Sequence, residues 1–329
     1  MAAGVPVLEE GFLDSTYQEY AAFTNATWHI VPRLDLTFGG RLSHNDQVAS
    51  QLLDSTALGG TRTEFDNRRS AQTVFTWSVA PRFKINDDTS VYARVATGYR
   101  PGGPNILPPL APPDTPASYN ADTVTSYEAG LKADWLHRTL SLDLAAYNID
   151  WNDVQVFTFV NGLGILTNGG TAVSRGVEFT ATARPTRGLT VSLNGAYTDA
   201  HLTEDAPPGT GGLNGDALPY VPKLSLNLSG DYQWTLKGAT TAYVGADFSF
   251  VGARSATFDL RHEVPSFETV DLRAGIDTGR WTLEAYVRNL ANAQGVTSLF
   301  SGVGTIPNNA MGVGVIRPRT VGLTLGARF

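Results

Sequence analysis

The sequence predicts an all-β protein, a transmembrane antiparallel β-barrel that is incomplete. Apolar and polar residues alternate with a period of two over long segments. The connections between these segments are alternately short turns and long Gly/Pro-rich loops, and aromatic residues are concentrated near the segment ends. Strands of soluble sheets run about five or six residues, whereas a tilted strand needs about nine to eleven to cross a bilayer. The alternation lasts long enough to favour membrane strands over a soluble sandwich.

The composition excludes several other classes of protein. The chain has 329 residues, no cysteine, 17% charged residues and a net charge of −7. It therefore has no disulfide framework or thiolate metal site, and its charge does not suit a general nucleic-acid binder. No apolar run reaches the roughly 18 residues of a membrane-spanning helix. Because the first residues lack a basic segment followed by an apolar one, we expect no signal peptide in this chain.

Individual segments show the alternation clearly. In residues 34–43, Leu34, Leu36 and Phe38 lie on one face, and Asp35 and Thr37 lie on the other. Successive side chains of a strand point to opposite faces, so such a segment separates an apolar from a polar environment. The same reading predicts 13 strands, near 17–31, 33–44, 70–84, 90–100, 123–135, 138–151, 174–184, 188–200, 222–235, 239–251, 267–277, 280–290 and 319–329.

The connections between these segments fall into two length classes. Short turns are expected at 32–33, 86–88, 137–138, 185–188, 236–238 and 277–279, and long polar loops at 44–69, 101–123, 152–173, 200–221, 252–267 and 291–318. This segregation is typical of barrels with short periplasmic turns and long external loops. We expect residues 1–16 to be an irregular N-terminal segment and residues 17–329 to be barrel.

The odd number of strands has a topological consequence. The first strand leads into a short turn, so the first and last strands both run toward the periplasm, whereas bacterial single-chain barrels have an even strand number. We therefore expect an open, curved sheet or a strained closure, with further strands absent upstream. Aromatic residues that resemble interfacial girdles are Trp28, Tyr99, Trp135, Tyr197, Tyr232 and Trp281.

Several segments, in order, resemble the C-terminal part of the barrel of TonB-dependent receptors, the plugged transporters of the outer membrane. The segments that carry the resemblance are VYARVATGYRPGGPN (91–105), SYEAGLKADW (126–135), LDLAAYNIDWNDVQV (142–156), GGTAVSRGVEFTATARP (169–185), VPKLSLNLSGDYQW (221–234), VDLRAGIDTGRWTLEAYVRNLANA (270–293) and RPRTVGLTLGARF (317–329). The resemblance spans about residues 15–329.

The resemblance implies a location, a function and partners. Barrels of this family have about 22 strands around a plugged lumen, so the chain would supply the last 13, without the plug. The implied role is uptake of a ferric siderophore or a similar bulky nutrient across the outer membrane of a Gram-negative bacterium. The implied partners are outer-membrane lipid, TonB through the missing plug, and the barrel assembly machinery through the C-terminal Phe329. No enzyme, cofactor or nucleic-acid partner is implied.

Two sets of polar residues are candidates for function. Tyr99, Arg100, Gly102, Gly103 and Asn105 lie where a strand enters an external loop. A guanidinium suits an anionic siderophore and glycine permits close approach, so we predict ligand binding there; the alternative is a loop-closing turn. The charges expected to face the lumen, the plug and one another are Asp35, Arg41, Arg82, Arg94, Glu128, Lys132, Asp134, Glu178, Asp231, Asp271, Arg273, Glu284 and Arg288.

Catalytic and metal motifs are not found. The five histidines show no metal-ligand spacing, no G-x-S-x-G nucleophile motif occurs, and the Gly-rich stretch 209–215 does not join a strand to a helix. We therefore predict neither catalytic residues nor a metal site. Two alternatives to a receptor segment stay open, a passive porin-like channel and a non-functional truncated fragment that exposes its first and last strand edges.

Overall fold

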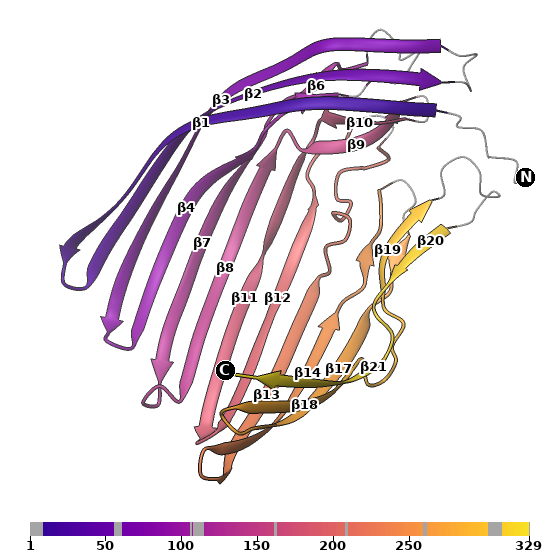
Figure 1. Cartoon of the computed structure of the whole chain (residues 1–329). Helices are drawn as coiled ribbons and strands as arrows, with labels where there is room; N and C mark the ends of the chain where they lie inside the picture. The colour runs from indigo at the N-terminus through magenta and orange to yellow at the C-terminus, as the bar shows by residue number, and fades with distance from the viewer. Residues whose placement is uncertain are drawn as a thin grey trace, which may run out of the picture.

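The computed structural model describes residues 9–55, 61–105, 107, 115–160, 163–207, 210–258, 262–301 and 311–328 (Figure 1). Thirteen strands form one antiparallel sheet, as the sequence predicts. In spatial order they are β1 (Glu9–Val31), β2 (Leu34–Ser55), β3 (Thr61–Asn86), β4 (Thr89–Arg100), β7 (Asp122–Trp135), β8 (Leu140–Asn152), β11 (Thr171–Thr186), β12 (Leu189–Leu202), β13 (Leu224–Lys237), β14 (Thr240–Val251), β17 (Phe267–Asp277), β18 (Trp281–Arg288) and β21 (Thr320–Ala327).

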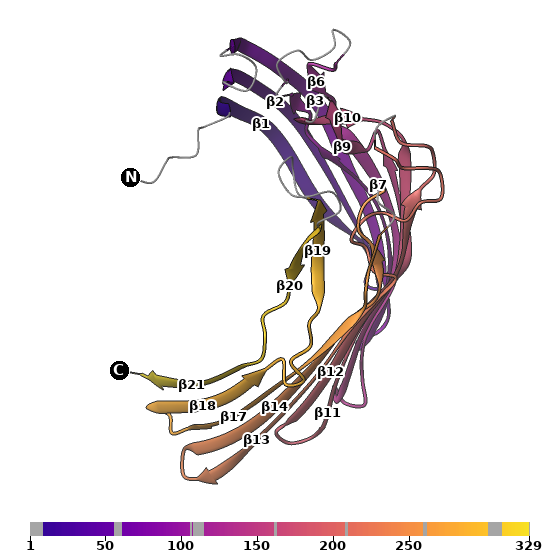
Figure 2. The ribbon, with the colours of Figure 1, turned by 90° about the vertical axis from the view of Figure 1, so that its right-hand side faces the viewer.

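The sheet is open, which confirms one of the two expected outcomes. Neighbouring strands follow chain order from β1 to β21, and among the described residues neither of these two edge strands has a second neighbour. Figure 2 shows the sheet as a trough that is concave on one side, with β1 and β21 on the two separate rims. The described part of the chain holds no plug domain and no helix long and apolar enough to cross a membrane.

The first three strands are longer than the sequence predicts. β1 begins at Glu9, within the segment expected to be irregular, and β2 and β3 continue through most of the expected loop 44–69. The pairing of β2 with β3 runs from Leu34 opposite Phe83 to Ser55 opposite Thr61. These extensions carry polar residues on both faces because they project beyond the apolar band into water, so the alternation ends while backbone pairing continues.

Four small hairpins occupy four of the external connections. β5 (Gly103–Pro104) pairs with β6 (Ser118–Tyr119), β9 (Gln155–Val160) with β10 (Leu163–Asn168), β15 (Arg254–Ser255) with β16 (Glu263–Val264), and β19 (Val296–Ser301) with β20 (Met311–Val315). Figure 2 shows β19 and β20 within the concavity of the trough. The external ends of the strands therefore carry folded secondary structure.

The two faces of the sheet differ in polarity. Phe38, Val79, Val95 and Tyr127 follow one another across β2, β3, β4 and β7 on the outward face. Of these, Phe38 is 44% exposed. So large an exposed apolar surface requires a lipid environment. The aromatic side chains exposed near the turn ends of strands are Trp28, Trp135, Tyr232 and Trp281, and those exposed nearer the loop ends are Tyr20, Tyr127 and Tyr197.

The only hydrophobic core formed by the described residues lies in the external loops. It consists of the buried side chains of Val154, Val156, Ala172 and Leu202, with Phe258 and a few others packed against them. Val154 and Val156 follow β8, Phe258 follows β14, and Ala172 and Leu202 stand at the external ends of β11 and β12. A one-layer sheet in lipid has no interior of its own, so this core is what gives the loops a fixed shape.

The lipid-facing assignment makes a direct prediction for Leu144. This residue lies opposite Leu131, midway along β7 between Tyr127 and Trp135, so it marks the bilayer midplane. We expect Leu144→Arg to lower the free energy of unfolding in lipid vesicles by about 2–4 kcal/mol, measured by urea titration.

Thr180→Arg is the matched control, because Thr180 lies opposite Asp143 on the polar face of the neighbouring strand. It should change that free energy by less than about 1 kcal/mol. Equal losses in the two variants would reverse or abolish the assignment of faces.

Candidate functional site

The predicted ligand residues lie at the point where β4 leaves the sheet. Gly102 passes so close to β6 that a Cβ atom there would stand 2.2 Å from the carbonyl oxygen of Tyr119. A Cβ on Gly103 would stand 2.8 Å from Oε1 of Gln47. Only glycine fits between the β2 extension and the β5–β6 hairpin without displacing one of them. The two glycines therefore let the chain turn into the mouth of the sheet.

Arg100 is the charged centre of this region. It lies opposite Asp122 on β7, and its Nη2 donates to Oδ2 of Asp122 at 2.5 Å. The guanidinium also stacks over the ring of Trp151 at 5.4 Å, and Nη2 reaches the carbonyl oxygen of Gln155 at 3.3 Å. Asp122 is 2% exposed, whereas the side chain of Arg100 is 50% exposed. The pair therefore fixes the strand ends while one side of the guanidinium stays open to solvent.

Neutral amide side chains connect the loops to one another. Asn105 is buried, and its Nδ2 donates to the carbonyl oxygens of Pro116 at 3.0 Å and Leu166 at 2.7 Å. Its Oδ1 accepts from the backbone N–H of Leu166 at 3.0 Å. Gln155 donates from Nε2 to the carbonyl oxygens of Pro101 and Asn120, each at 3.0 Å. The β5–β6 and β9–β10 hairpins are thus joined by hydrogen bonds to side chains.

The extended part of β2 supports the same loop. Nδ2 of Asn45 donates to the hydroxyl of Tyr99 at 2.8 Å, and the hydroxyl of Tyr17 donates to Oδ1 of Asn45 at 2.7 Å. Gln51 holds the backbone of Leu107 with a bond to its N–H at 3.1 Å and one to its carbonyl at 3.2 Å. Tyr99 is therefore engaged with the loop support and does not belong to an aromatic girdle.

We call this network the mouth clasp. It consists of Tyr17, Asn45, Gln51, Tyr99, Arg100, Gly102, Gly103, Asn105, Asp122, Trp151 and Gln155. The five residues predicted from the sequence are all in it, but most of their polar groups bond to protein. In the structure these five residues close a loop, and their contact with a ligand stays a prediction. The sequence-based prediction missed Asn45, Gln51 and Gln155, whose only sign is a set of amides in segments expected to be loops.

The predicted lumen charges lie on the polar face, and most of them are paired across strands. Arg41 bonds Glu19 at 2.6 Å, and Arg82 bonds Asp35 at 2.5 Å. The remaining paired members are Glu128 with Tyr92, Lys132 with Asp143, Asp134 with Ser141, Asp271 with the backbone N–H of Asn289, Glu284 with Tyr243, and Arg273 with Asp231 and Asp247. Arg288 stacks over Tyr286 at 5.0 Å. Cross-strand pairs of this kind contribute modestly to sheet stability.

Two of the predicted lumen charges have no bonding partner among the described residues. Arg94 on β4 and Glu178 on β11 are exposed, and neither makes a side-chain hydrogen bond or ion pair with the described residues. Glu178 borders a hollow of about 440 Å³ together with Tyr92, Glu128 and Lys132. Charges without a partner in the sheet are the ones best placed to contact something inside the trough.

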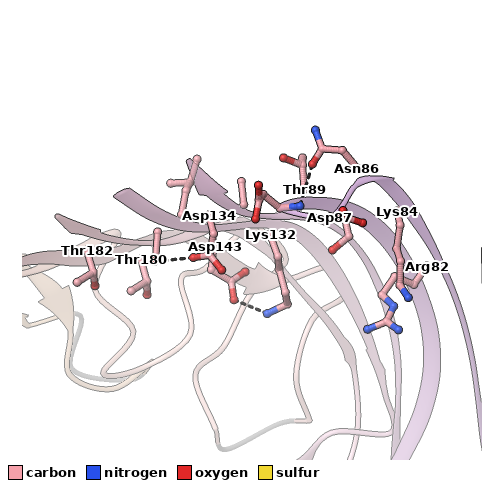
Figure 3. A pocket seen from close by; sticks show the side chains of 15 residues that line it. Arg82, Lys84, Asn86, Asp87, Thr89, Lys132, Asp134, Asp143, Thr180 and Thr182 are labelled. Atoms are coloured by element: carbon pink, nitrogen blue, oxygen red, sulfur yellow. Dashed lines mark hydrogen bonds and ion pairs between the residues drawn. The ribbon is translucent and has the colours of Figure 1, made fainter. Parts of the chain in front are cut away.

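A second polar hollow, of about 400 Å³, lies near the short turns of β3, β4 and β7 (Figure 3). The sheet arches over Arg82, Lys132 and Asp143, whose side chains project to its concave side. Opposite charges alternate here, and Lys132 pairs with Asp143. Within the described residues, no group of three or more His, Asp or Glu side chains is placed to hold a metal ion. The wall is therefore a charge-balanced surface.

Long lipid-facing strands, a charge-paired concave face and structured external loops together define a wall of an outer-membrane β-barrel receptor. The family described as "TonB dependent receptor-like, beta-barrel" matches residues 6–290. The chain belongs to this family of TonB-dependent receptors, which are transporters and not enzymes. This confirms the resemblance seen in the sequence and places the protein among outer-membrane barrels.

Known relatives are similar in sequence and in fold. The pesticin receptor of Yersinia pestis is 27% identical over 282 residues, which cover 84% of this chain and 39% of that receptor. The metal-pseudopaline receptor CntO of Pseudomonas aeruginosa is 26% identical over 277 residues, or 84% of this chain and 37% of CntO. The crystal structure of the ferric yersiniabactin uptake receptor FyuA from Yersinia pestis matches with a TM-score of 0.82 and 23% identity, covering 96% of this chain and 46% of FyuA. The chain thus spans less than half the length of each.

Proposed function

We propose that this chain forms part of the wall and the external mouth of a receptor that takes up a ferric siderophore or a similar metal chelate. The observation that carries the proposal is the mouth clasp, a rigid external site on a barrel of the receptor family. The names of the relatives, a metal-pseudopaline receptor and a ferric yersiniabactin uptake receptor, support the ligand class.

Ligand contact is proposed at Arg100 and the loop surface that it holds. Its guanidinium is half exposed, and its fork can bond a carboxylate or phenolate of an anionic chelate while it stays paired with Asp122. Phe157 on β9 is 59% exposed and adds an aromatic surface at the same mouth. Gly102, Gly103 and Asn105 shape this surface from beneath, and Tyr99 fixes its base.

Arg94 and Glu178 are proposed to contact a plug, because each carries an exposed charge that makes no side-chain hydrogen bond or ion pair with the described residues. TonB would then act through that plug, as in the family. The open sheet encloses no lumen, so we propose that the chain is not competent for transport by itself. Cells that express only this chain should show no TonB-dependent uptake of ferric yersiniabactin and no channel conductance in planar bilayers. Steady conductance would favour a passive channel.

The ligand proposal is tested with Arg100→Lys in the outer-membrane receptor that contains this chain. Lysine keeps the charge beside Asp122 but loses the fork that serves two anions at once. We expect the affinity for ferric yersiniabactin, measured by fluorescence quenching in outer-membrane vesicles, to fall about tenfold, because a bond to a charged group contributes about 1.5–3 kcal/mol.

Arg69→Lys is the matched control. Arg69 pairs with Asp46 on the extension of β2 and β3, where Asp46 follows the clasp residue Asn45 but points to the opposite face of the strand. Its affinity should stay within about twofold of the parent protein. Equal affinity in the Arg100 and Arg69 variants, or no binding of any ferric chelate by the parent, would rule out the proposed contact.

A further inference from the structure

Tyrosine side chains on the concave face form a repeated contact across three strands. Tyr147 on β8 lies over Gly176 on β11, and its hydroxyl bonds Thr198 on β12 at 2.9 Å. Thr198 is the residue directly opposite Gly176. A Cβ on Gly176 would stand 2.9 Å from that hydroxyl, so the tyrosine can cross the strand only because glycine is there. We call this arrangement a tyrosine bridge.

The same arrangement occurs again in the second half of the sheet. Tyr243 on β14 lies over Gly275 on β17, and its hydroxyl donates to Glu284 on β18 at 2.8 Å. Glu284 is again the residue opposite the glycine. In both cases the tyrosine of one strand covers a glycine on the next and bonds a polar side chain on the strand after that.

Tyr286 begins a third bridge, whose last member is not among the described residues. It lies opposite Gly322 on β21, and a Cβ on Gly322 would stand 2.3 Å from its hydroxyl. Arg288 stacks on the ring at 5.0 Å and holds it in place. β21 is the edge of the sheet, so the strand that would carry the third member is not among the described residues.

A related contact shows what the hydroxyl does when the third strand offers no partner. Tyr92 covers Gly130, but the residue opposite Gly130 is Ala145, and the hydroxyl instead donates to Glu128, two residues from the glycine, at 2.6 Å. On β21 the two residues in comparable positions are Thr320 and Thr324. The described contacts include no bond from Tyr286 to either of them, so its hydroxyl is left for the strand beyond.

The direction of the free edges restricts which strand can lie there. β1 and β21 both run from the external side to the side of the short turns, and every pair in the sheet is antiparallel. A second copy inserted in the same orientation could offer β21 only a parallel edge. The chain covers 46% of the FyuA structure. The strand that lies beside β21 is therefore expected to come from the complementary portion of a receptor barrel.

A closed receptor barrel leaves no strand edge unpaired, so an antiparallel strand of its complementary portion lies beside β21. We infer that this strand places a hydrogen-bonding side chain opposite Gly322 and so completes the bridge from Tyr286. The bridge fixes the register of the closing seam, because a shift by one residue turns that side chain to the lipid face. This inference concerns how the barrel is completed and does not depend on the ligand.

Site-specific photocrosslinking in outer membranes tests the inference. The photoreactive residue p-benzoylphenylalanine replaces Thr324, which lies on the concave face of β21 two residues from Gly322. Mass spectrometry should map the adduct to a receptor-barrel strand that runs antiparallel to β21 and has Glu, Asp, Gln, Asn, Ser or Thr opposite Gly322. Adducts with a second copy of this chain, with lipid alone, or with a strand that has an apolar residue there would overturn it.

Tyr286→Phe gives a second measurement that keeps the ring over Gly322 and removes only the hydroxyl. Loss of one hydrogen bond should lower the crosslinking yield at Thr324 about two- to tenfold. Tyr147→Phe is the matched control, because its hydroxyl bonds Thr198 within the chain and neither residue lies on a strand next to β21. Its yield should equal that of the parent, and an equal loss in both variants would count against a bridge across the seam.

Discussion

Arg100→Ala is expected to free the external loop of β4 from the sheet and to lower the local free energy of opening by about 2–3 kcal/mol. The substitution removes the bond to Asp122, the stacking on Trp151 and the bond to the carbonyl of Gln155. Asp122 then keeps a buried charge with only the backbone N–H of Gln155, at 3.2 Å, beside it. Removing one partner of a fully buried pair costs about 3–5 kcal/mol, and the half-exposed arginine reduces this value.

Hydrogen exchange of the amides in 101–105 and 115–122 measures this opening. Asp122→Ala should lower the free energy of local opening less than Arg100→Ala does. A half-exposed guanidinium without its partner is solvated, whereas a buried carboxylate without its partner is not. The pair of Arg69 and Asp46 provides a baseline. Arg69→Ala should change the free energy of local opening around residue 69 by less than about 1 kcal/mol. A larger effect from Asp122→Ala than from Arg100→Ala would contradict this account of the clasp.

The sheet could be predicted from the sequence because a bilayer imposes both strand length and alternation. The turns after β11, β13 and β17 were also predictable, since Gly188, Gly238 and Gly279 have positive φ angles of 82°, 58° and 83° at the expected turns. The extensions of β1, β2 and β3 were not predictable in the same way. Both of their faces lie in water, so nothing selects an apolar side, and cross-strand pairing is all that makes them strands.

The candidate site was predictable only in part, and the physical reason is the nature of its contacts. Tyr99, Arg100, Gly102, Gly103 and Asn105 were found because they follow a membrane strand in a recognisable segment. Their partners lie far away in the chain, as with Asn105 and Leu166 or Arg100 and Gln155. Such bonds join an amide or guanidinium side chain to a backbone carbonyl of a distant loop hairpin, and this pairing has no period in the sequence.

The loop core and the mouth clasp depend on each other through Trp151. Its ring lies under the guanidinium of Arg100, and the residue also packs against the core of Val154, Val156, Ala172 and Leu202. The site that we propose for ligand is therefore supported by packing in loops that do not contact the ligand. Loss of that packing should reach Arg100 through the displaced indole.

Leu202→Ala is the substitution expected to have the largest effect on the loops. Leu202 is fully buried, and its backbone ties β12 to the following loop, with its N–H bonded to the carbonyl of Asp216 at 2.9 Å. Truncating a buried leucine costs about 2–5 kcal/mol, because transfer energy is lost and a cavity remains. We expect a loss of about 3–4 kcal/mol in the free energy of local opening, because Leu202 is fully buried among the apolar side chains of the loop core.

The measurement is hydrogen exchange of the loop amides in 203–207 and 210–220 compared with that of the strands β8, β11 and β12. Exchange should rise in the loops and stay slow in the strands, because lipid and cross-strand bonds hold the sheet independently of this core. Leu213→Ala is the matched control, since Leu213 lies in the same loop but is 49% exposed; its effect should stay below about 1 kcal/mol. If Leu202→Ala loosened loops and strands equally, the loop core would be part of the barrel's own stability and not a separate support for the mouth.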